Sequence, residues 1–572
     1  MAQSISKEFD YVKEDVKYPY HYKNDSMGHN PILSERLLEP NHHVNKPRRR
    51  KKRTGRSVHN AHTPHLDIIE ATDKKDVLQQ SLFISLPLEI LLKISSEYSL
   101  SARDLINLSL SCKYFSASIL NGRCIAEEAA KLGLYYLLSN SIPMALERIR
   151  IEGMDQLLNE CLTPNSNETW LQVYDAVHKL YTQKYVDKGT MCCAGGSHTG
   201  IVTEGELYTF GLGNNGQLGL GSYNDVLIPT QVNIQPYGRD FMRRGLRVDR
   251  VKARYISCGL LYSALVSDRG VLYTCGKNTR GELGYPALRD EGEQDDQGYF
   301  PYFFVGVLLP ESISVKTVEC GDHHTAIITD TGLLYTFGGN EHGQLGLGDF
   351  SNRREPALVE TLRAFICTQV SAFTHTAVVT VCGALFTFGE GERGQLGSCD
   401  AKTCPVPNRV NCLKRKRVIH VAAGYSHMLV VTSRGELYSC GWNAHYRLGI
   451  RELAPSSIAV EPTKVLFPGV VRIRKVWAGM SHSLALSEGG ELYGWGRNLN
   501  GEVGVMGLET EYQITPKCIL SVKEPVVQAS GGLSHTLAVT ADGGVYSWGS
   551  GAKGRLGHGT THNKIYPGLI KV

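Results

Sequence analysis

Hydrophobic and polar residues alternate with a period of two along the C-terminal two-thirds of the chain. In His482-Ser-Leu-Ala-Leu-Ser487 the leucines alternate with small residues, and two glycines, Gly489 and Gly490, separate this run from Glu491-Leu-Tyr-Gly-Trp495. Such alternation predicts strands with one buried face, and the glycine pair between them predicts a β-hairpin. A preceding run, Ile473–Ala478, and a later strand that contains proline complete a unit of four predicted strands.

The same unit recurs seven times between residues 188 and 572. Each copy has a Gly-x-Leu-Tyr-like hairpin followed by a Gly-x-Leu-Gly-like turn. The hairpins are Gly205–Tyr208, Gly270–Tyr273, Gly332–Tyr335, Gly383–Phe386, Gly435–Tyr438, Gly490–Tyr493 and Gly543–Tyr546. The turns are Gly216–Gly219, Gly281–Gly284, Gly343–Gly346, Gly394–Gly397, Tyr446–Gly449, Gly501–Gly504 and Gly554–Gly557. A unit this short cannot bury a core alone, so seven copies predict an all-β, seven-bladed β-propeller.

The two ends of the repeat array suggest how the ring closes. The array opens at Met191–His198, which looks like the second half of a unit, and it ends at Tyr566–Val572, which looks like the first half. We expect these halves to meet in one blade, which would remove the free sheet edges.

The N-terminal part has a different pattern. Residues 1–78 are polar, basic and aperiodic, which predicts disorder. Residues 82–120 contain two stretches with helical spacing of apolar residues, Leu86–Ile94 and Ala102–Phe115, and Pro87 is tolerated in a first helical turn. Residues 121–187 are predicted to continue as a helical connector, whose last helix, Trp170–Tyr181, packs on the strand-rich domain.

Composition and charge also indicate where in the cell the protein is located. Only five of the 60 glycines precede residue 188, and the net charge is only +5. A dense basic run in the polar region is typical of a nuclear-import signal. Its charged residues are Lys46, Arg48, Arg49, Arg50, Lys51, Lys52 and Arg53. The run predicts a nuclear protein, with the cytoplasm as an additional location.

The rest of the sequence argues for an intracellular chain. We expect no secretory signal, because the first ten residues lack an apolar core, and no membrane span. The 15 cysteines are expected to be reduced and mostly buried in strands.

Several patterns resemble catalytic or cofactor motifs. Gly211-Leu-Gly-Asn-Asn-Gly216 and two equivalent segments match a dinucleotide fingerprint, but no helix is predicted to follow that could hold a phosphate. Six histidines recur before the inner hairpin, and we expect each to fix its turn through a backbone hydrogen bond, because one histidine per blade forms too wide a ring for a single metal ion. They are His198, His324, His375, His427, His482 and His535. No catalytic residue, metal or cofactor is therefore predicted.

Clusters of arginine and lysine leave nucleic-acid binding open as a weaker alternative. Phosphate contacts need only clustered positive charge. The candidates are Arg243, Arg244, Arg247, Arg250 and the run Lys414–Arg417.

The repeat resembles the regulator of chromosome condensation (RCC-type) repeat. The motif stands here as Gly205-Glu-Leu-Tyr-Thr-Phe-Gly-Leu-Gly-Asn-Asn-Gly-Gln-Leu-Gly219, then Pro229, then Cys258-Gly-Leu-Leu-Tyr-Ser263. The resemblance covers residues 188–572 and implies a seven-bladed propeller. A plant ultraviolet-B photoreceptor with this repeat uses clustered tryptophans. Here the corresponding turns read Gly-Tyr-Ser-His, Gly-Met-Ser-His and Gly-Leu-Ser-His, which argues against photoreception.

The segment 82–120 resembles an F-box, a small α-helical domain that docks on the Skp-type adaptor of a cullin–RING ubiquitin ligase. The match lies in the opening Ser85-Leu-Pro-Leu-Glu-Ile-Leu91 and the ending Leu108-Ser-Leu-Ser-Cys-Lys-Tyr-Phe115, whereas Ser95–Ala102 is longer and more polar than the family pattern. The resemblance implies an adaptor-binding set. Its members are Leu86, Pro87, Ile90, Leu91, Ile94, Leu105, Leu108, Cys112 and Phe115.

Together these resemblances predict a non-enzymatic substrate receptor. The F-box would bind the Skp-type adaptor and cullin complex of an SCF-type ubiquitin ligase, and the propeller would bind a protein target. The alternatives are guanine-nucleotide exchange on a Ran-like small GTPase, as the founding member of the repeat family performs, and a chromatin-associated scaffold.

Overall fold

The computed structural model describes residues 189–234, 251–285, 302–309, 313–505, 507 and 510–572, with short pieces at 119–120, 123–124, 172–173 and 176–177. The predicted disordered region 1–78 lies outside these residues. Ile119–Leu120 (β1) and Arg123–Cys124 (β2) pair antiparallel, so the prediction of helix at residues 123 and 124 is wrong. Residues 172–173 and 176–177 are helical. No helix among the described residues is long and apolar enough to cross a membrane.

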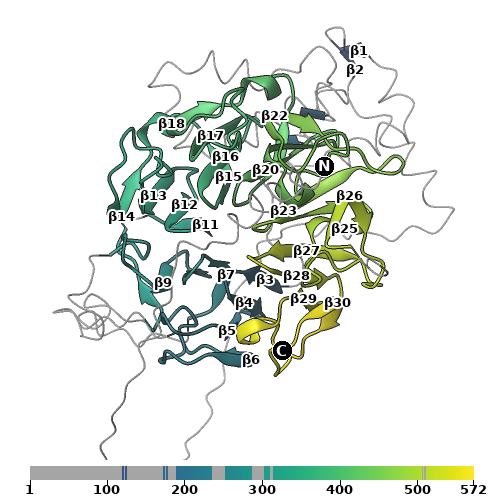
Figure 1. Ribbon diagram of the computed structural model, residues 1–572. Helices are drawn as coiled ribbons and strands as arrows, with labels where there is room; N and C mark the ends of the chain where they lie inside the picture. The colour runs from purple at the N-terminus through teal and green to yellow at the C-terminus, as the bar shows by residue number, and fades with distance from the viewer. Residues whose placement is uncertain are drawn as a thin grey trace, which may run out of the picture. The chain divides into compact units, whose positions relative to one another are not determined.

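The strand-rich part is a ring of seven sheets, as predicted (Figure 1). Each sheet is an antiparallel meander of four consecutive strands, with the first strand innermost. Blades 1 and 2 are β3 (Met191–Ala194), β4 (His198–Thr203), β5 (Glu206–Gly211), β6 (Val226–Gln231), and β7 (Ala253–Cys258), β8 (Tyr262–Ser267), β9 (Leu272–Gly276), β10 (Val305–Gly306). Blades 3 and 4 are β11 (Val315–Cys320), β12 (His324–Thr329), β13 (Leu334–Gly338), β14 (Arg353–Leu358), and β15 (Cys367–Ala372), β16 (His375–Thr380), β17 (Leu385–Gly389), β18 (Cys404–Arg409).

The remaining three blades repeat the arrangement. Blades 5 and 6 are β19 (Val418–Ala423), β20 (His427–Thr432), β21 (Leu437–Trp442), β22 (Ile458–Lys464), and β23 (Ile473–Ala478), β24 (His482–Ser487), β25 (Leu492–Arg497), β26 (Tyr512–Cys518). Blade 7 is β27 (Val526–Gly531), β28 (His535–Thr540), β29 (Val545–Gly549) and β30 (Lys564–Leu569). Short 3-10 helices are η1 (Glu360–Leu362), η2 (Asn411–Leu413), η3 (Ala444–Tyr446) and η4 (Ala552–Gly554).

The predicted closure of the ring by a shared blade is wrong. β3 is the innermost strand of blade 1 and β30 the outermost strand of blade 7, so each end of the array lies in a complete blade of its own. The ring closes through contacts between neighbouring blades. At this seam the N–H of Cys192 donates to Gln528 Oε1 at 3.1 Å, and the Thr199 hydroxyl donates to the Arg555 carbonyl at 2.8 Å.

The meander defines two faces of the ring. Connections between first and second strands, and between third and fourth strands, lie on one face, which we call the turn face. The hairpins between second and third strands lie on the other, the hairpin face. Prolines occupy fourth strands, for example Pro229 in β6 and Pro516 in β26, where an edge strand tolerates a missing N–H.

The Gly-x-Leu-Gly turns pack each blade on the next. Their apolar third residue is buried, as for Leu218 and Leu345 at 0% exposure. The last glycine has a positive φ, and in six of the seven turns it faces an aromatic side chain of the following blade. In Gly504 (φ +73°) an added Cβ would lie 2.5 Å from Trp548 Nε1. Trp548 is fully buried and donates to the Glu502 carbonyl at 2.9 Å, so glycine is required there on two grounds.

We expect Gly504→Ala to lower the melting temperature far more than Gly469→Ala. Both glycines have positive φ, +73° and +92°, but nothing lies within 4 Å of a Cβ at Gly469. The control substitution therefore costs only the backbone strain, about 1–2 kcal/mol. Gly504→Ala adds overpacking of about 1–3 kcal/mol. Equal shifts of the two variants in thermal unfolding followed by circular dichroism would contradict this account.

Candidate functional site

The predicted adaptor-binding and import residues lie outside the described residues. This applies to the whole set from Leu86 to Phe115 and to the basic run from Lys46 to Arg53. The candidate site among the described residues is the centre of the propeller, together with the contacts that line it.

The recurrent histidines connect neighbouring blades. His198 Nε2 lies 2.9 Å from Ser263 Oγ on blade 2, and that hydroxyl donates to the Gln217 carbonyl of the blade 1 turn at 2.8 Å. The same relay recurs around the ring. The other pairs are His324–Thr376, His427–Ser483, His482–Thr536 and His535–Thr199, at 2.7–3.1 Å. Because the hydroxyl donates to the carbonyl, Nε2 carries the proton and donates to the hydroxyl.

These contacts correct the role predicted for the histidines. Their side chains reach a hydroxyl of the next blade instead of a backbone group of their own turn. The turn itself is closed by backbone atoms, as in the bond from the Gly195 N–H to the His198 carbonyl at 3.0 Å. His375 is the exception, because Met428 occupies the place of the hydroxyl residue. Neither ring nitrogen of His375 has a hydrogen-bond partner in the part of the chain that the structure describes.

Burial holds these imidazoles neutral. It lowers the pKa of His198, His324, His375 and His482 to about 3. The pKa values of His427 and His535 also lie well below the usual range, first because of burial and then because of nearby arginines. Neutral, enclosed imidazoles with structural partners suit packing between blades better than proton transfer to a substrate.

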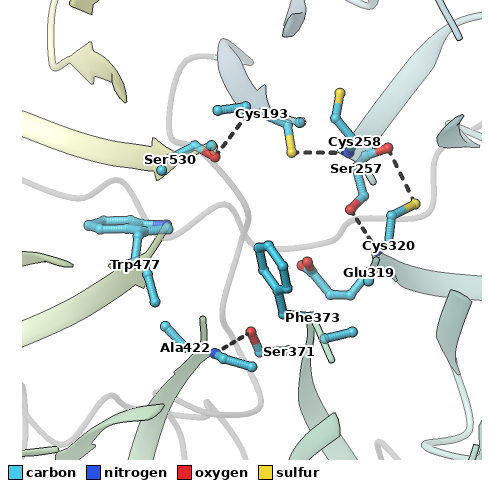
Figure 2. A pocket seen from close by; sticks show the side chains of 18 of the residues that line it. Cys193, Ser257, Cys258, Glu319, Cys320, Ser371, Phe373, Ala422, Trp477 and Ser530 are labelled. Carbon is cyan, nitrogen blue, oxygen red and sulfur yellow. Dashed lines mark hydrogen bonds between the residues drawn. The ribbon is translucent and has the colours of Figure 1, made fainter. Parts of the chain in front are cut away.

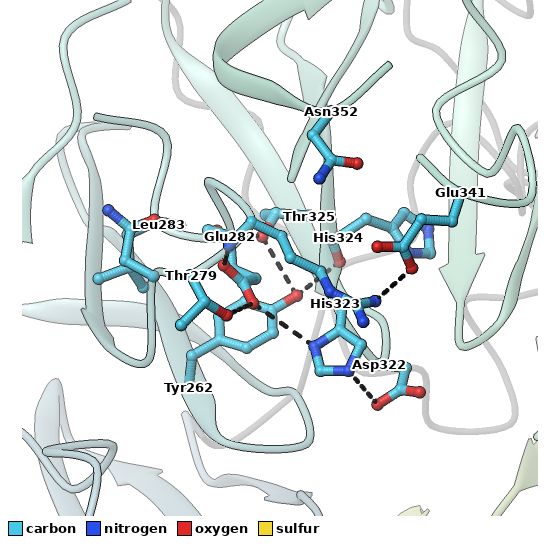
Figure 3. Close-up of polar contacts among 12 residues, drawn as sticks. Tyr262, Thr279, Glu282, Leu283, Asp322, His323, His324, Thr325, Glu341 and Asn352 are labelled. Carbon is cyan, nitrogen blue, oxygen red and sulfur yellow. Dashed lines mark hydrogen bonds and ion pairs between the residues drawn. The ribbon is translucent and has the colours of Figure 1, made fainter. Parts of the chain in front are cut away.

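A polar cluster between blades 2 and 3 resembles an acid–base pair (Figure 3). His323 Nδ1 lies 3.4 Å from Glu282 Oε1, and its Nε2 lies 3.6 Å from Asp322 Oδ1. However, Glu282 Oε2 also accepts the Arg280 N–H at 2.7 Å, just as Gln344 Oε1 accepts the equivalent N–H at 2.9 Å in the next blade. Glu282 therefore serves first as the cap of its turn.

The inner strands line a central cavity of about 200 Å³ at the turn face (Figure 2). On the free edge of these strands, backbone N–H groups donate to side chains of the preceding blade. The penultimate residue of one inner strand accepts the N–H of the last residue of the next. The pairs are Ser530–Ala194, Cys193–Cys258, Ser257–Cys320 and Ser371–Ala423, at 2.9–3.2 Å. Small hydroxyl and thiol side chains at this level therefore hold the blades together.

Three residues around the cavity depart from this pattern. Glu319 and Trp477 stand at the penultimate position, where other blades have Ser, Cys or Ala. Phe373 stands where the six other blades have glycine, since its N–H bonds to the His375 carbonyl as that of Gly195 bonds to His198. Sequence reasoning missed Glu319 and Phe373. Comparing the seven repeats with one another, position by position, is the signal that could have found them.

Glu319 is held inside the cavity by one hydrogen bond. The Tyr255 hydroxyl donates to its Oε1 at 2.5 Å. Enclosure by the cavity walls raises the pKa of Glu319 to about 7, although the bond from Tyr255 acts in the opposite direction. Among the described residues no ion pair to Glu319 is present within 4.0 Å.

The basic run Lys414–Arg417, a candidate for phosphate contacts, is partly used by the fold. Arg417 is 4% exposed and donates to the Cys382 carbonyl at 2.8 Å. Lys416 lies 3.3 Å from Glu436 Oε2. Lys414 and Arg415 are exposed, so half of the run faces solvent. Arg243, Arg244, Arg247 and Arg250 lie outside the described residues.

The tryptophans are dispersed. Trp495 and Trp548 are fully buried, and each donates its indole N–H to a turn carbonyl of the preceding blade at 2.9 Å. Trp442 lies at the rim of blade 5 with the Arg393 guanidinium 3.8 Å from its ring centre.

Comparisons with known proteins match both parts of the chain. A family model described as RCC1-like domain matches residues 164–471 and 374–571, and one described as F-box-like matches residues 83–124. The ultraviolet-B receptor of Arabidopsis thaliana is 32% identical over 381 residues, 66% of this chain and 80% of that protein. The secretion-regulating guanine nucleotide exchange factor of Bos taurus is 30% identical over 409 residues, 65% of this chain and 81% of that protein.

A solved structure shows the same fold. The crystal structure of Prp20p from Saccharomyces cerevisiae superposes with a TM-score of 0.56 at 21% identity, covering 69% of this chain and 89% of that one.

We expect the melting temperature to fall as the pH is lowered from 7 to 5. Unfolded histidines bind protons below about pH 6.5, whereas the buried ones keep a pKa of about 3. The unfolded chain therefore binds more protons in acid, and stability is lost as the pH falls through this window. Each such histidine changes the free energy of unfolding by at most about 1.4 kcal/mol per pH unit.

A matched pair of variants tests whether the buried histidines cause this pH dependence of stability. His375→Gln removes one buried histidine that has no hydrogen bond to lose and should flatten the pH dependence. His562→Gln changes an exposed histidine and should leave it as in the wild type. A melting temperature that does not vary between pH 7 and 5 would refute the assignment.

Proposed function

The chain belongs to the family with an RCC1-like propeller domain, and on that premise we propose that it is the substrate-recognition subunit of an SCF-type cullin–RING E3 ubiquitin ligase. The single observation that carries the proposal is the F-box-like segment at residues 83–124 in the same chain as the propeller. That combination fits an F-box substrate receptor. In the proposed complex the F-box binds a Skp-type adaptor and the propeller binds the target protein.

The proposed mechanism is one of positioning. The chain catalyses no reaction itself and raises the effective concentration of the target near the ligase. The relay of buried histidines and hydroxyls supports this role, because it connects neighbouring blades and gives a rigid binding surface. The turn face, with its central cavity, is the surface we assign to the target. The basic run Lys46–Arg53 would direct the receptor to the nucleus.

Adaptor binding tests the proposal. Full-length chain should capture a purified Skp-type adaptor, and Leu86→Ala combined with Pro87→Ala should reduce the capture about tenfold or more, because apolar anchor residues dominate such interfaces. Leu137→Ala combined with Leu138→Ala, beyond the F-box-like match, is the matched control and should bind as the wild type does. Failure of the wild-type chain to bind the adaptor would remove the receptor proposal.

Guanine-nucleotide exchange is the second candidate, because the Bos taurus relative carries that activity in its name. Fold likeness alone does not transfer an activity. Under the receptor proposal, the full chain should leave nucleotide release from a panel of Ran-like GTPases unchanged when release is followed with a fluorescent guanine nucleotide. Accelerated release would favour the exchange factor. A chromatin scaffold role retains only the exposed half of Lys414–Arg417 among the described candidates.

A further inference from the structure

Three residues that differ from their equivalents in the other blades line the same cavity. Glu319 comes from β11 of blade 3, Phe373 from the first turn of blade 4, and Trp477 from β23 of blade 6. All three line the central cavity (Figure 2). A symmetric ring needs none of these side chains for its own closure, because serine, cysteine and alanine fill the same level elsewhere.

Glu319 is an enclosed carboxyl group that has no ion-pair partner within 4.0 Å among the described residues. In the blades with serine or cysteine at this level, the side chain accepts an N–H of the next blade. Glu319 lines the cavity instead, and among the described residues its one hydrogen bond comes from the Tyr255 hydroxyl. A carboxylate enclosed without a positive partner is costly unless a cation joins it.

Phe373 and Trp477 supply aromatic surface beside this charge. Phe373 packs edge-on against Tyr425, with ring centres 5.8 Å apart, and Trp477 lies 6.1 Å from the ring centre of His420. Both rings are held by neighbours and remain partly exposed to the cavity. Aromatic faces attract cations, and guanidinium groups in particular stack on them while donating hydrogen bonds in their own plane.

The charges around the cavity favour entry of a cation from the turn face. Asp322 lies in a turn at that face, next to the strand that carries Glu319, and also lines the cavity. Arg474 and Lys475 line it too, but they precede Trp477 in β23 and so lie further toward the hairpin face. The acidic residues that line the cavity therefore lie nearer the turn face than the basic ones.

We propose that this cavity binds the guanidinium group of an arginine side chain presented by a protein partner. The group would donate a hydrogen bond to the free oxygen of Glu319 and lie against the ring of Phe373 or Trp477. The volume of about 200 Å³ is below the roughly 300–1,000 Å³ of pockets for drug-sized ligands and suits one side chain. This inference adds to the proposed receptor role the chemical group that the cavity recognises on the target. It rests on that role only for the statement that the arginine belongs to a protein.

Ligand-observed NMR on the full-length chain tests the cavity directly. N-acetyl-arginine methylamide should receive saturation transfer from the protein, whereas the citrulline analogue, which has the same shape without the charge, should not. Glu319→Gln should weaken arginine binding on the order of tenfold, because it removes the charge and keeps the volume. Phe373→Leu should weaken it severalfold through loss of the aromatic face.

The controls separate this site from general charge effects and from the ligase role. Glu206→Gln, which removes a carboxylate outside the cavity, should bind arginine as the wild type does. Equal binding of citrulline, or wild-type affinity in Glu319→Gln, would overturn the proposal, and tighter binding of the trimethyl-lysine analogue would replace guanidinium by quaternary ammonium. Adaptor capture by the same proteins is independent of this readout, so failure of either proposal is recognised separately.

Discussion

The propeller depends on the unpaired edge of each inner strand. A blade pairs its first strand with its second only, so the other edge of the first strand carries N–H groups that need acceptors. The neighbouring blade supplies them through serine, cysteine and glutamine side chains, and it adds the histidine relay one layer further out. Because these bonds join one blade to the next, an isolated sheet would leave such N–H groups without acceptors, and packing the sheets into a ring supplies them.

Much of this architecture could be predicted from the sequence because strand alternation and glycine turns are local signals. The strands at Ile473–Ala478 and His482–Ser487 have the predicted bounds. The closure was wrong for a physical reason. A repeating pattern can be divided into units at any phase without changing its period, and only hydrogen bonding between strands decides where a blade begins. The hydrogen-bond partners of the histidines could not be predicted from the sequence either, because each partner belongs to a neighbouring blade.

The candidate cavity was harder to foresee than the fold. Glu319, Phe373 and Trp477 lie on different repeats, and none belongs to a motif with recognisable spacing. Each becomes informative only when the blades are superposed and the residue that breaks the symmetry is compared with its six equivalents. In blade 4 the first turn is one residue shorter, which is why Phe373 is accepted where a Cβ at Gly195 would lie 2.6 Å from the imidazole of His198. Sevenfold repetition thus supplies an internal reference for finding function.

The seam between blades 7 and 1 has a consequence for how such rings can change in evolution. No strand is exchanged between the chain ends, so each of the seven sheets is encoded by one uninterrupted stretch of sequence. The bonds across the seam, from Cys192 to Gln528 and from Ala194 to Ser530, are of the same kind as those between interior blades. A gene segment for one blade can therefore be duplicated or replaced without dividing a sheet, and the sheets themselves do not dictate at which blade the repeat array begins.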